Sequence, residues 1–191
     1  MRIFGIDPGS ERTGYGCLET DAGATHLVKC GAVSALPGDA FPQRLARIHR
    51  ELSALLIECA PDCVAIENVF HAVNVRSALK LGHARGVAML AAVEAGCPVA
   101  EYSPTEIKRS VVGYGRADKH QVQQMIKLLL GLDQLPSPHD AADALAVAIC
   151  HLHSVPSYAG ADSGVSDYAE PASSRRPQLK TWRQYRPPTA G

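Results

Sequence analysis

The chain opens with a short apolar segment that ends in a carboxylate. Residues 2–6 (RIFGI) have the near-continuous apolar character of a buried strand, and Asp7 follows them directly. Turn-forming residues 8–10 (PGS) come next, and residues 13–20 then predict the second strand of a β-hairpin. An ionised aspartate at the end of a buried strand is costly to desolvate unless another group pairs with it. Asp7 is therefore either a functional carboxylate or the cap of the following turn, and this segment alone leaves both interpretations open.

A second apolar segment also ends in an acid. Residues 63–66 (CVAI) predict a buried strand, and Glu67 follows them. If this strand is the parallel neighbour of the first, the two strand ends lie roughly 5 Å apart between backbones. Two buried strands that each end in a carboxylate are a stronger signal than either alone, so Asp7 and Glu67 are candidates for one site.

The remaining pattern places helices between and after the strands, which indicates an α/β fold. Further short strands are predicted over residues 25–35 and 98–100. Apolar residues recur at helical spacing, with cap and stop signals nearby, in five regions: 41–60, 75–95, 103–112, 118–131 and 137–153.

The helix predicted over residues 75–95 contains two glycines four residues apart, Gly82 and Gly86. Glycine costs a helix about 1 kcal/mol relative to alanine. Two glycines on one face therefore indicate the close approach of another backbone. The approaching partner is either the sheet or a second subunit.

The last predicted helix has two aspartates near its start, Asp140 and Asp143. Their spacing places both on one face. Asp140 has a structural explanation, because with Ser137 as cap it completes a capping box. Asp143 has none: its neighbours are almost all apolar, which predicts a buried helix, and a buried unpaired aspartate is rare. Asp143 is thus the stronger functional candidate.

Composition bounds the organisation of the chain. Its 191 residues, 46% of them apolar, suffice for one domain with a substantial core. From residue 155 onward Ser, Pro, Gly and Ala dominate and the end is basic, which is typical of a disordered tail. We therefore predict a folded domain over residues 1–154 and a tail over residues 155–191.

Several classes of protein are disfavoured. No apolar run is long enough to cross a membrane and no signal peptide opens the chain, so we expect a cytoplasmic protein that does not associate with membranes. The six cysteines have neither CxxC nor zinc spacing and are expected to be reduced thiols. The formal net charge is zero, but residues 76–127 contain eight basic and four acidic side chains. That small imbalance suits a phosphate-binding surface beside an acidic pocket, although an ordinary solvated surface explains it too.

The four candidate acids need a counter-charge, and no lysine or arginine lies beside Glu67, Asp140 or Asp143 in the sequence. Hard oxygen ligands without sulfur or a clear imidazole set select magnesium or manganese. Two such ions suit the in-line hydrolysis of a phosphodiester.

Taken together, these segments resemble the RuvC family of Holliday-junction resolvases, which have an RNase H-like fold. The resemblance covers residues 1 to about 153 in order. The matching segments are 5–10 (GIDPGS) with 13–16 (TGYG), 66–70 (IENVF), 77–82 (SALKLG) with 84–86 (ARG), 111–113 (VVG) and 140–146 (DAADALA), together with Lys108 and Lys119.

The resemblance implies an RNase H-like nuclease domain with a mixed five-stranded sheet flanked by helices. It also implies a homodimer that nicks two opposed strands of a four-way DNA junction in recombination and repair. The cuts would leave 5′-phosphate and 3′-hydroxyl ends, and the junction branch-migration proteins RuvA and RuvB are the expected partners. Magnesium is the expected cofactor, with two ions per site and manganese as a substitute.

The resemblance also implies roles for individual residues. The family's catalytic and metal-binding acids fall on Asp7, Glu67, Asp140 and Asp143. Its DNA-contacting lysines fall on Lys108 and Lys119, and an aromatic at the junction centre falls on Phe70. Spacing alone is equally compatible with Phe70 as a core aromatic. Some relatives have histidine at the position of Asp140, which His139 precedes here.

Other interpretations share parts of these patterns. Actin-like ATPases and sugar kinases have a similar opening turn but need two such domains, more than 191 residues supply. Proofreading exonucleases usually have Asp-x-Glu on the first strand, which residues 7–9 (DPG) lack. RNase H proper places an acid on another strand, for which Glu101 is a candidate. A non-catalytic junction-binding platform is disfavoured because all four acids are present.

Overall fold

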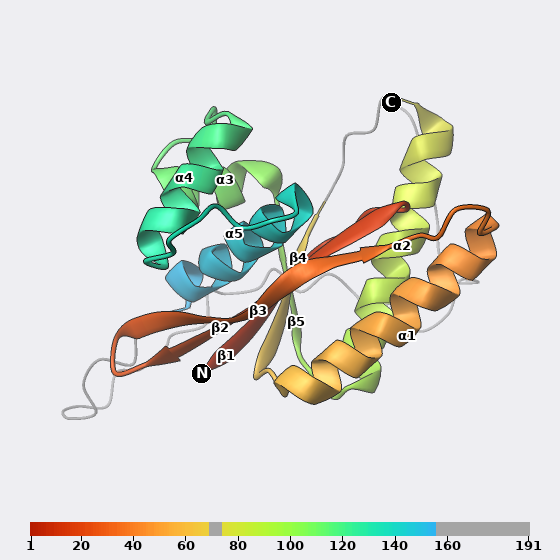
Figure 1. Ribbon diagram of the computed structural model, residues 1–191, viewed down its shortest axis with the longest axis horizontal. Coiled ribbons are helices and arrows are strands. Elements are labelled where there is room, and N and C mark those ends of the chain that lie inside the picture. Colours follow the sequence, from red (N-terminus) through yellow and green to blue (C-terminus); the bar gives the residue numbers. More distant parts are fainter. Residues whose placement is uncertain (69–73, 156–191) are drawn as a thin grey trace, which may run out of the picture. The chain divides into compact units, whose positions relative to one another are not determined.

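The computed structural model describes residues 1–68 and 74–155, and every predicted helix and strand is found there with ends within one or two residues of prediction (Figure 1). The elements in chain order are β1 (Arg2–Asp7), β2 (Arg12–Asp21), β3 (Ala24–Ser34), α1 (Phe41–Cys59), β4 (Cys63–Glu67), α2 (Val75–Glu94), β5 (Val99–Tyr102), α3 (Pro104–Val112), α4 (Lys119–Leu129) and α5 (His139–Ser154).

The five strands form one mixed sheet in the order β3-β2-β1-β4-β5. The first three strands form an antiparallel meander, whereas β4 pairs in parallel with β1 and β5 in parallel with β4. This arrangement confirms the predicted RNase H-like fold. Because β1 lies at the centre, its carboxyl end has strand neighbours on both sides.

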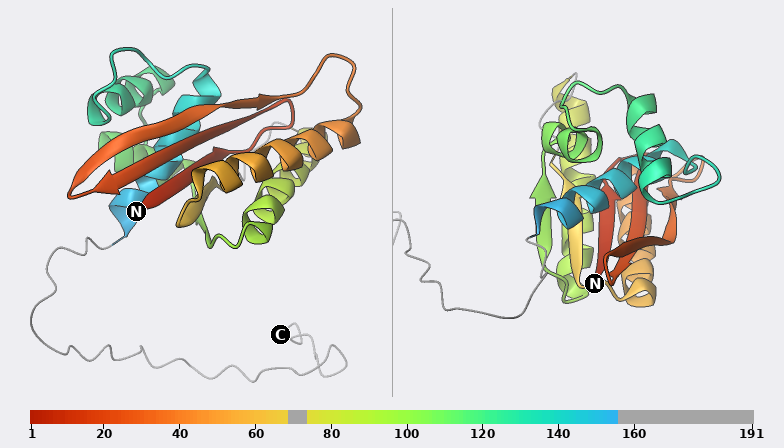
Figure 2. Two further views of the ribbon diagram at one scale, coloured as in Figure 1. Left: turned by 60° about the horizontal axis from the view of Figure 1, so that its bottom comes forward. Right: turned by 90° about the vertical axis from the view of Figure 1, so that its left-hand side faces the viewer.

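Helices cover both faces of the sheet (Figure 2), and side chains alternate along the strands between two hydrophobic cores. Phe4, Ile6 and Ile66 face α1 and α2. Ile3 and Ala65 face α5, against which α3 and α4 pack. Full burial of each large aliphatic side chain stabilises the fold by roughly 1.5–3 kcal/mol, so both faces of the sheet contribute to stability.

Helix α5 lies directly on the backbone of β1 and β2. A Cβ atom added to Gly5 would overlap the carbonyl oxygen of Ala144, and one added to Gly14 would overlap that of Asp140. One added to Gly16 would meet the side chain of Leu145. Glycine is therefore required at positions 5 and 14 because the helix backbone occupies the space of a side chain, and at position 16 the Leu145 side chain occupies that space.

The two glycines of α2 behave differently. A Cβ atom at Gly82 or Gly86 would meet no atom of the described residues within 4 Å. Of the two alternatives left open by the sequence, packing of these glycines on the sheet is therefore excluded, because the face of α2 that contains them points away from it.

Two further predictions concern the chain as a whole. The six cysteines are all free thiols, as predicted. Within the two described ranges, no helix combines the length and the apolar character needed to span a membrane. The predicted tail and Phe70 lie outside the described residues.

The close approach of α5 predicts the cost of filling one glycine. We expect Gly5→Ala to lower the free energy of unfolding by about 1–3 kcal/mol or more, because backbone atoms of α5 cannot move aside cheaply. Gly31→Ala is the matched control in the same sheet, since the nearest atom there is the hydroxyl of Tyr15, at the end of a side chain. Urea denaturation of both variants measures the difference, and equal losses would contradict the role given to Gly5.

Candidate active site

Asp7 and Glu67 lie side by side at the carboxyl ends of the two central parallel strands. Ile6 and Ile66 are paired in the β1–β4 register, so the next residue on each strand is one of these acids. Each acid lies two residues beyond a position that faces α5, Gly5 on β1 and Ala65 on β4. Both carboxylates therefore project toward α5.

The turn after Asp7 does not depend on the Asp7 side chain. Buried Thr13 closes this turn: its hydroxyl donates a hydrogen bond to the carbonyl of Gly9 at 2.8 Å and accepts one from the Gly9 N–H at 3.4 Å. The alternative in which Asp7 serves as the turn cap is thus unnecessary.

The first turn of α5 adds Asp140 above the end of β1. Gly14, which pairs with Asp7 across β1 and β2, lies beneath the Asp140 carbonyl. The predicted capping box is wrong, because the N-cap of α5 is Pro138 and no side chain caps the helix. Asp140 instead forms an ion pair with Arg12, whose Nη1 lies 3.4 Å from Oδ2.

Asp143 is less buried than its apolar neighbours in the sequence suggest. Its side chain is 26% exposed and accepts a hydrogen bond from the Lys119 ammonium, with Nζ 2.6 Å from Oδ2. The expectation of a buried, unpaired aspartate is therefore wrong. Lys119 begins α4, and the packing of α4 on α5 supplies the counter-charge that the local sequence lacks.

A cavity of about 390 Å³ brings most of the predicted site together. Its charged lining residues are Asp7, Glu67, Asp143, Lys108 and Lys119. Lys108 comes from α3, and apolar residues of α2, α3 and α4 complete the wall. Asp140 faces a neighbouring cavity instead, and Phe70 lies outside the described residues.

The crowding of acids changes their protonation. Burial, then the negative charges of Glu67 and Asp143, raise the pKa of Asp7 from 3.8 to about 8. Burial also raises the pKa of Glu67, although its hydrogen bond with Asp7 and the charges of Lys108 and Lys119 oppose that shift. Without a cation, Asp7 therefore holds a proton at neutral pH.

Lys119 keeps its charge in this environment, whereas Asp7 is neutralised by a proton. Burial lowers its pKa, but the hydrogen bond and negative charge of Asp143 outweigh burial, and the pKa of Lys119 lies above its ordinary value. The lysine remains charged and neutralises part of the acidic cluster.

The donor set fits a divalent cation in its chemistry. Within residues 1–68 and 74–155, however, no three acidic, histidine or cysteine side chains converge as a ready-made metal site. Asp143 is turned to Lys119 and Asp140 to Arg12. The candidate ligands are all carboxylate oxygens, which magnesium and manganese prefer. The raised pKa of Asp7 indicates that the lysines do not fully compensate the negative charge of the cluster.

Glu101, the acid considered for an RNase H proper, lies on the other side of the sheet. It pairs in register with Ile66, so its side chain projects opposite to that of Glu67. There it forms an ion pair with Arg85 of α2. Glu101 is thus separated from the acidic cluster by the sheet itself.

Comparison with known proteins places this arrangement in context. The family model described as Crossover junction endodeoxyribonuclease RuvC matches residues 3–151. A protein of that name from Koribacter versatilis is 56% identical over 154 residues, which are 80% of this chain and 93% of that protein. Another, from Trichlorobacter lovleyi, is 49% identical over 187 residues and covers 98% of this chain and 100% of its own.

Solved structures agree with these sequence comparisons. Thermus thermophilus RuvC in complex with a Holliday junction substrate superposes with a TM-score of 0.75 at 36% identity and covers 80% of this chain and 93% of its own. The yeast mitochondrial Holliday junction resolvase superposes with a TM-score of 0.55 at 14% identity, over 79% of this chain and 78% of its own. The second likeness concerns the fold alone.

The raised pKa of Asp7 predicts a pH dependence of stability. Between pH 3.8 and about 8 the folded protein retains a proton that the unfolded chain has lost. Raising the pH through this window therefore favours the unfolded chain, and stability falls. We expect the melting temperature in chelator to fall more steeply across this window for the wild type than for Asp7→Asn. Asp133→Asn, an exposed site outside the cluster, is the control and should behave as the wild type. Parallel curves for all three proteins would contradict the assignment.

Proposed function

The chain belongs to the RuvC family of crossover junction endodeoxyribonucleases, and from this premise we propose that it cuts four-way DNA junctions at the acidic cavity. It acts as a nuclease on Holliday junctions in recombination and repair. Paired nicks in opposed strands would leave 5′-phosphate and 3′-hydroxyl ends. The observation that supports this site most strongly is the convergence of three acids and two lysines in one cavity, drawn from five separate elements.

The acids serve to hold divalent cations. Asp7, Glu67, Asp140 and Asp143 would bind magnesium, or manganese in its place, as two ions per site. Bound there, the ions would activate the attacking water and stabilise the leaving oxygen. Cation binding requires that Asp7 give up the proton that burial holds on it. It also competes with the Lys119 ammonium for Asp143, which leaves that lysine available to DNA.

The two lysines then act on phosphates. Lys108 and Lys119 border the same cavity as the acids, from α3 and the start of α4. Their charge would attract the DNA backbone and stabilise negative charge that develops during cleavage. Contacts to phosphates position DNA without reading its sequence. Stacking of Phe70 on an unpaired base remains a prediction.

A second copy of the chain would supply the second cut. The outer face of α2 has exposed apolar side chains, among them Leu79 at 59% exposure, around a shallow hollow that includes Gly82 and Gly86. An exposed apolar patch of this kind indicates a protein contact, and the glycines would allow a second helix to approach closely. A two-fold dimer suits paired cuts in a junction with near two-fold symmetry. RuvA and RuvB are the further partners proposed.

Loss of one acid should abolish cutting. Asp143→Asn removes one charge with little change in shape, and an amide is a poorer magnesium ligand than a carboxylate. We expect cleavage to fall on the order of a thousandfold or more, since each loss of about 1.36 kcal/mol in the transition state is tenfold. Junction affinity should hold or rise because one repelling anion is gone.

The measurement compares a mobile four-way junction, a linear duplex and an RNA–DNA hybrid, each with magnesium and with chelator. Asp133→Asn should cut at the wild-type rate. An Asp143→Asn variant that also cuts at that rate would remove Asp143 from the site. A wild type that binds the junction without cutting it would favour the non-catalytic platform.

The dimer interface can be tested with a matched pair of surface changes. Leu79→Glu should yield monomers, because a charge would be buried between two copies of α2. Ile57→Glu, on α1 and 77% exposed, should leave the dimer intact. Sedimentation at micromolar concentration distinguishes the two, and a wild type that sediments only as monomer, with and without junction DNA, would exclude the proposed dimer.

A further inference from the structure

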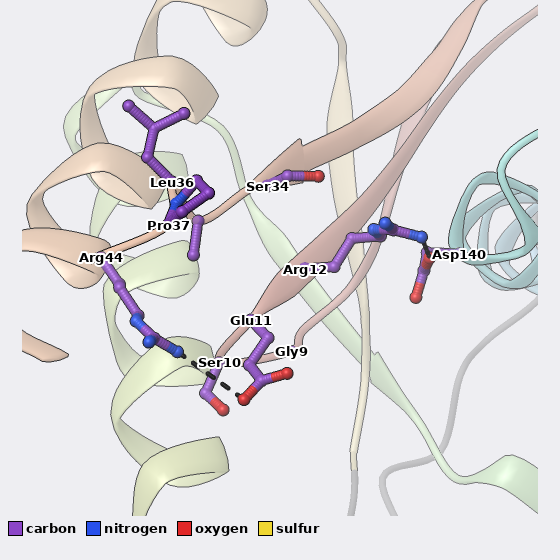
Figure 3. Close-up of a pocket in the computed structure, with 10 residues that line it drawn as sticks. Gly9, Ser10, Glu11, Arg12, Ser34, Leu36, Pro37, Arg44 and Asp140 are labelled. Atoms are coloured by element: carbon purple, nitrogen blue, oxygen red, sulfur yellow. Dashed lines mark hydrogen bonds and ion pairs between the residues drawn. The ribbon is translucent and has the colours of Figure 1, made fainter. Parts of the chain in front are cut away.

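A second cavity adjoins the acidic site, and its lining residues other than Asp140 have no part in the function described so far. It measures about 720 Å³ and lies between the β1–β2 turn, the end of β3, the start of α1 and Asp140 (Figure 3). We call it the arginine cavity; its lining residues are Gly9, Ser10, Glu11, Arg12, Ser34, Ala35, Leu36, Pro37, Arg44 and Asp140. Its volume falls in the range of small-molecule and nucleotide sites.

Arg44 is held in place with part of its guanidinium directed into this cavity. Its Nε donates a hydrogen bond to the carbonyl of Asp39 at 3.0 Å, which fixes the side chain. Its Nη1 lies 3.7 Å from the carboxylate of Glu11, a side chain that is 85% exposed. By contrast Arg47, on the same helix, pairs with Asp39 and Glu51 at 3.2 and 3.5 Å. Arg47 is thus committed to the fold, whereas Arg44 is oriented but weakly paired.

Arg12, on β2, lines the opposite side of the cavity, and its guanidinium is directed toward Asp140 and away from Arg44 (Figure 3). Its side chain is 52% exposed, and its Nη1 lies 3.4 Å from Oδ2 of Asp140. Exposed ion pairs of this kind contribute only about 0–1 kcal/mol. A phosphate can therefore displace the Asp140 carboxylate from Arg12. A cation bound by Asp140 would weaken this ion pair further.

The two cavities lie on either side of the central strand. Pro8 lines the acidic cavity and Gly9 lines the arginine cavity, so the turn after β1 separates them. On α5, Asp143 faces one cavity and Asp140 the other. The acids thus stand between Lys108 and Lys119 on the β4 side and the two arginines on the β2–β3 side.

From this arrangement we propose that the arginine cavity binds one nucleotide of the strand being cut, next to the scissile phosphate and on the side away from the lysines. Arg12 and Arg44, on opposite sides of the cavity, would contact the phosphate backbone of this strand, because the planar guanidinium matches phosphate geometry. Leu36 and Pro37 offer an apolar wall for the sugar. The inference rests on the proposed cutting of junction DNA and adds two positioning residues to it.

The test combines changes on both sides of the contact. Junctions are made with a single neutral methylphosphonate in place of each phosphate near the cut, and binding is measured in chelator, so that cation loading does not enter. The proteins are the wild type, Arg12→Gln, the Arg12→Gln/Arg44→Gln double variant and the control Arg50→Gln, an exposed arginine on α1 outside the cavity.

For the wild type and Arg50→Gln, one methylphosphonate beside the scissile position should weaken binding about tenfold. The double variant should bind the unmodified junction about tenfold more weakly and lose sensitivity at that position alone. The slope of log affinity against log salt should fall by about 1. Should the double variant fail to fold, Arg12→Gln alone should show a reduced sensitivity at the same position.

Equal sensitivity of wild type and Arg12→Gln at every position would overturn the inference. The same holds if the lost sensitivity lies on the lysine side of the cut, where Lys119→Ala should act. A wild type that neither binds nor cuts the junction would overturn the proposed function instead, so the two failures are distinguishable.

Discussion

The close packing of α5 on the backbone of β1 and β2 is the constraint on which the rest of this structure depends. The helix can approach the sheet because Gly5 and Gly14 leave room for its carbonyl oxygens and because its own facing side chains are small. This contact sets the height of Asp140 and Asp143 above Asp7 and Glu67. A helix held further out would leave the same four acids in the sequence without bringing Asp140 and Asp143 close to Asp7 and Glu67.

The cluster that results is electrostatically unfavourable by itself, and three different groups compensate it. A proton neutralises Asp7, the Lys119 ammonium pairs with Asp143, and the Arg12 guanidinium pairs with Asp140. A cation can displace the proton from Asp7, and the Lys119 ammonium and the Arg12 guanidinium can each pair with a phosphate instead. Clustered charge of this kind lowers stability, and folds retain it where function requires it.

The two faces of the sheet have separate tasks. On one face α5, α3 and α4 assemble the acids with the bases that neutralise them. On the other, α1 and α2 cover a second core of aliphatic and aromatic side chains, and the outer surface of α2 remains apolar. Changes to exposed side chains such as Leu79 can therefore alter assembly without touching the chemistry, because these side chains do not line the acidic cavity, unlike Leu81 of the same helix.

The sequence by itself determined the local features of this protein. Its periodicity located the helices and strands, and the two strand ends at Asp7 and Glu67 indicated the site before any contact was known. Contacts between residues distant in the chain could not be predicted from these local patterns. The Lys119–Asp143 pair, the Arg12–Asp140 pair and the outward direction of Gly82 depend on which elements pack together. The failed cap at Ser137 and the exposure of Asp143 have the same origin. Periodicity and capping act over a few neighbouring residues, whereas the partner of a charge is chosen by packing between elements that the sequence separates by tens of residues or more.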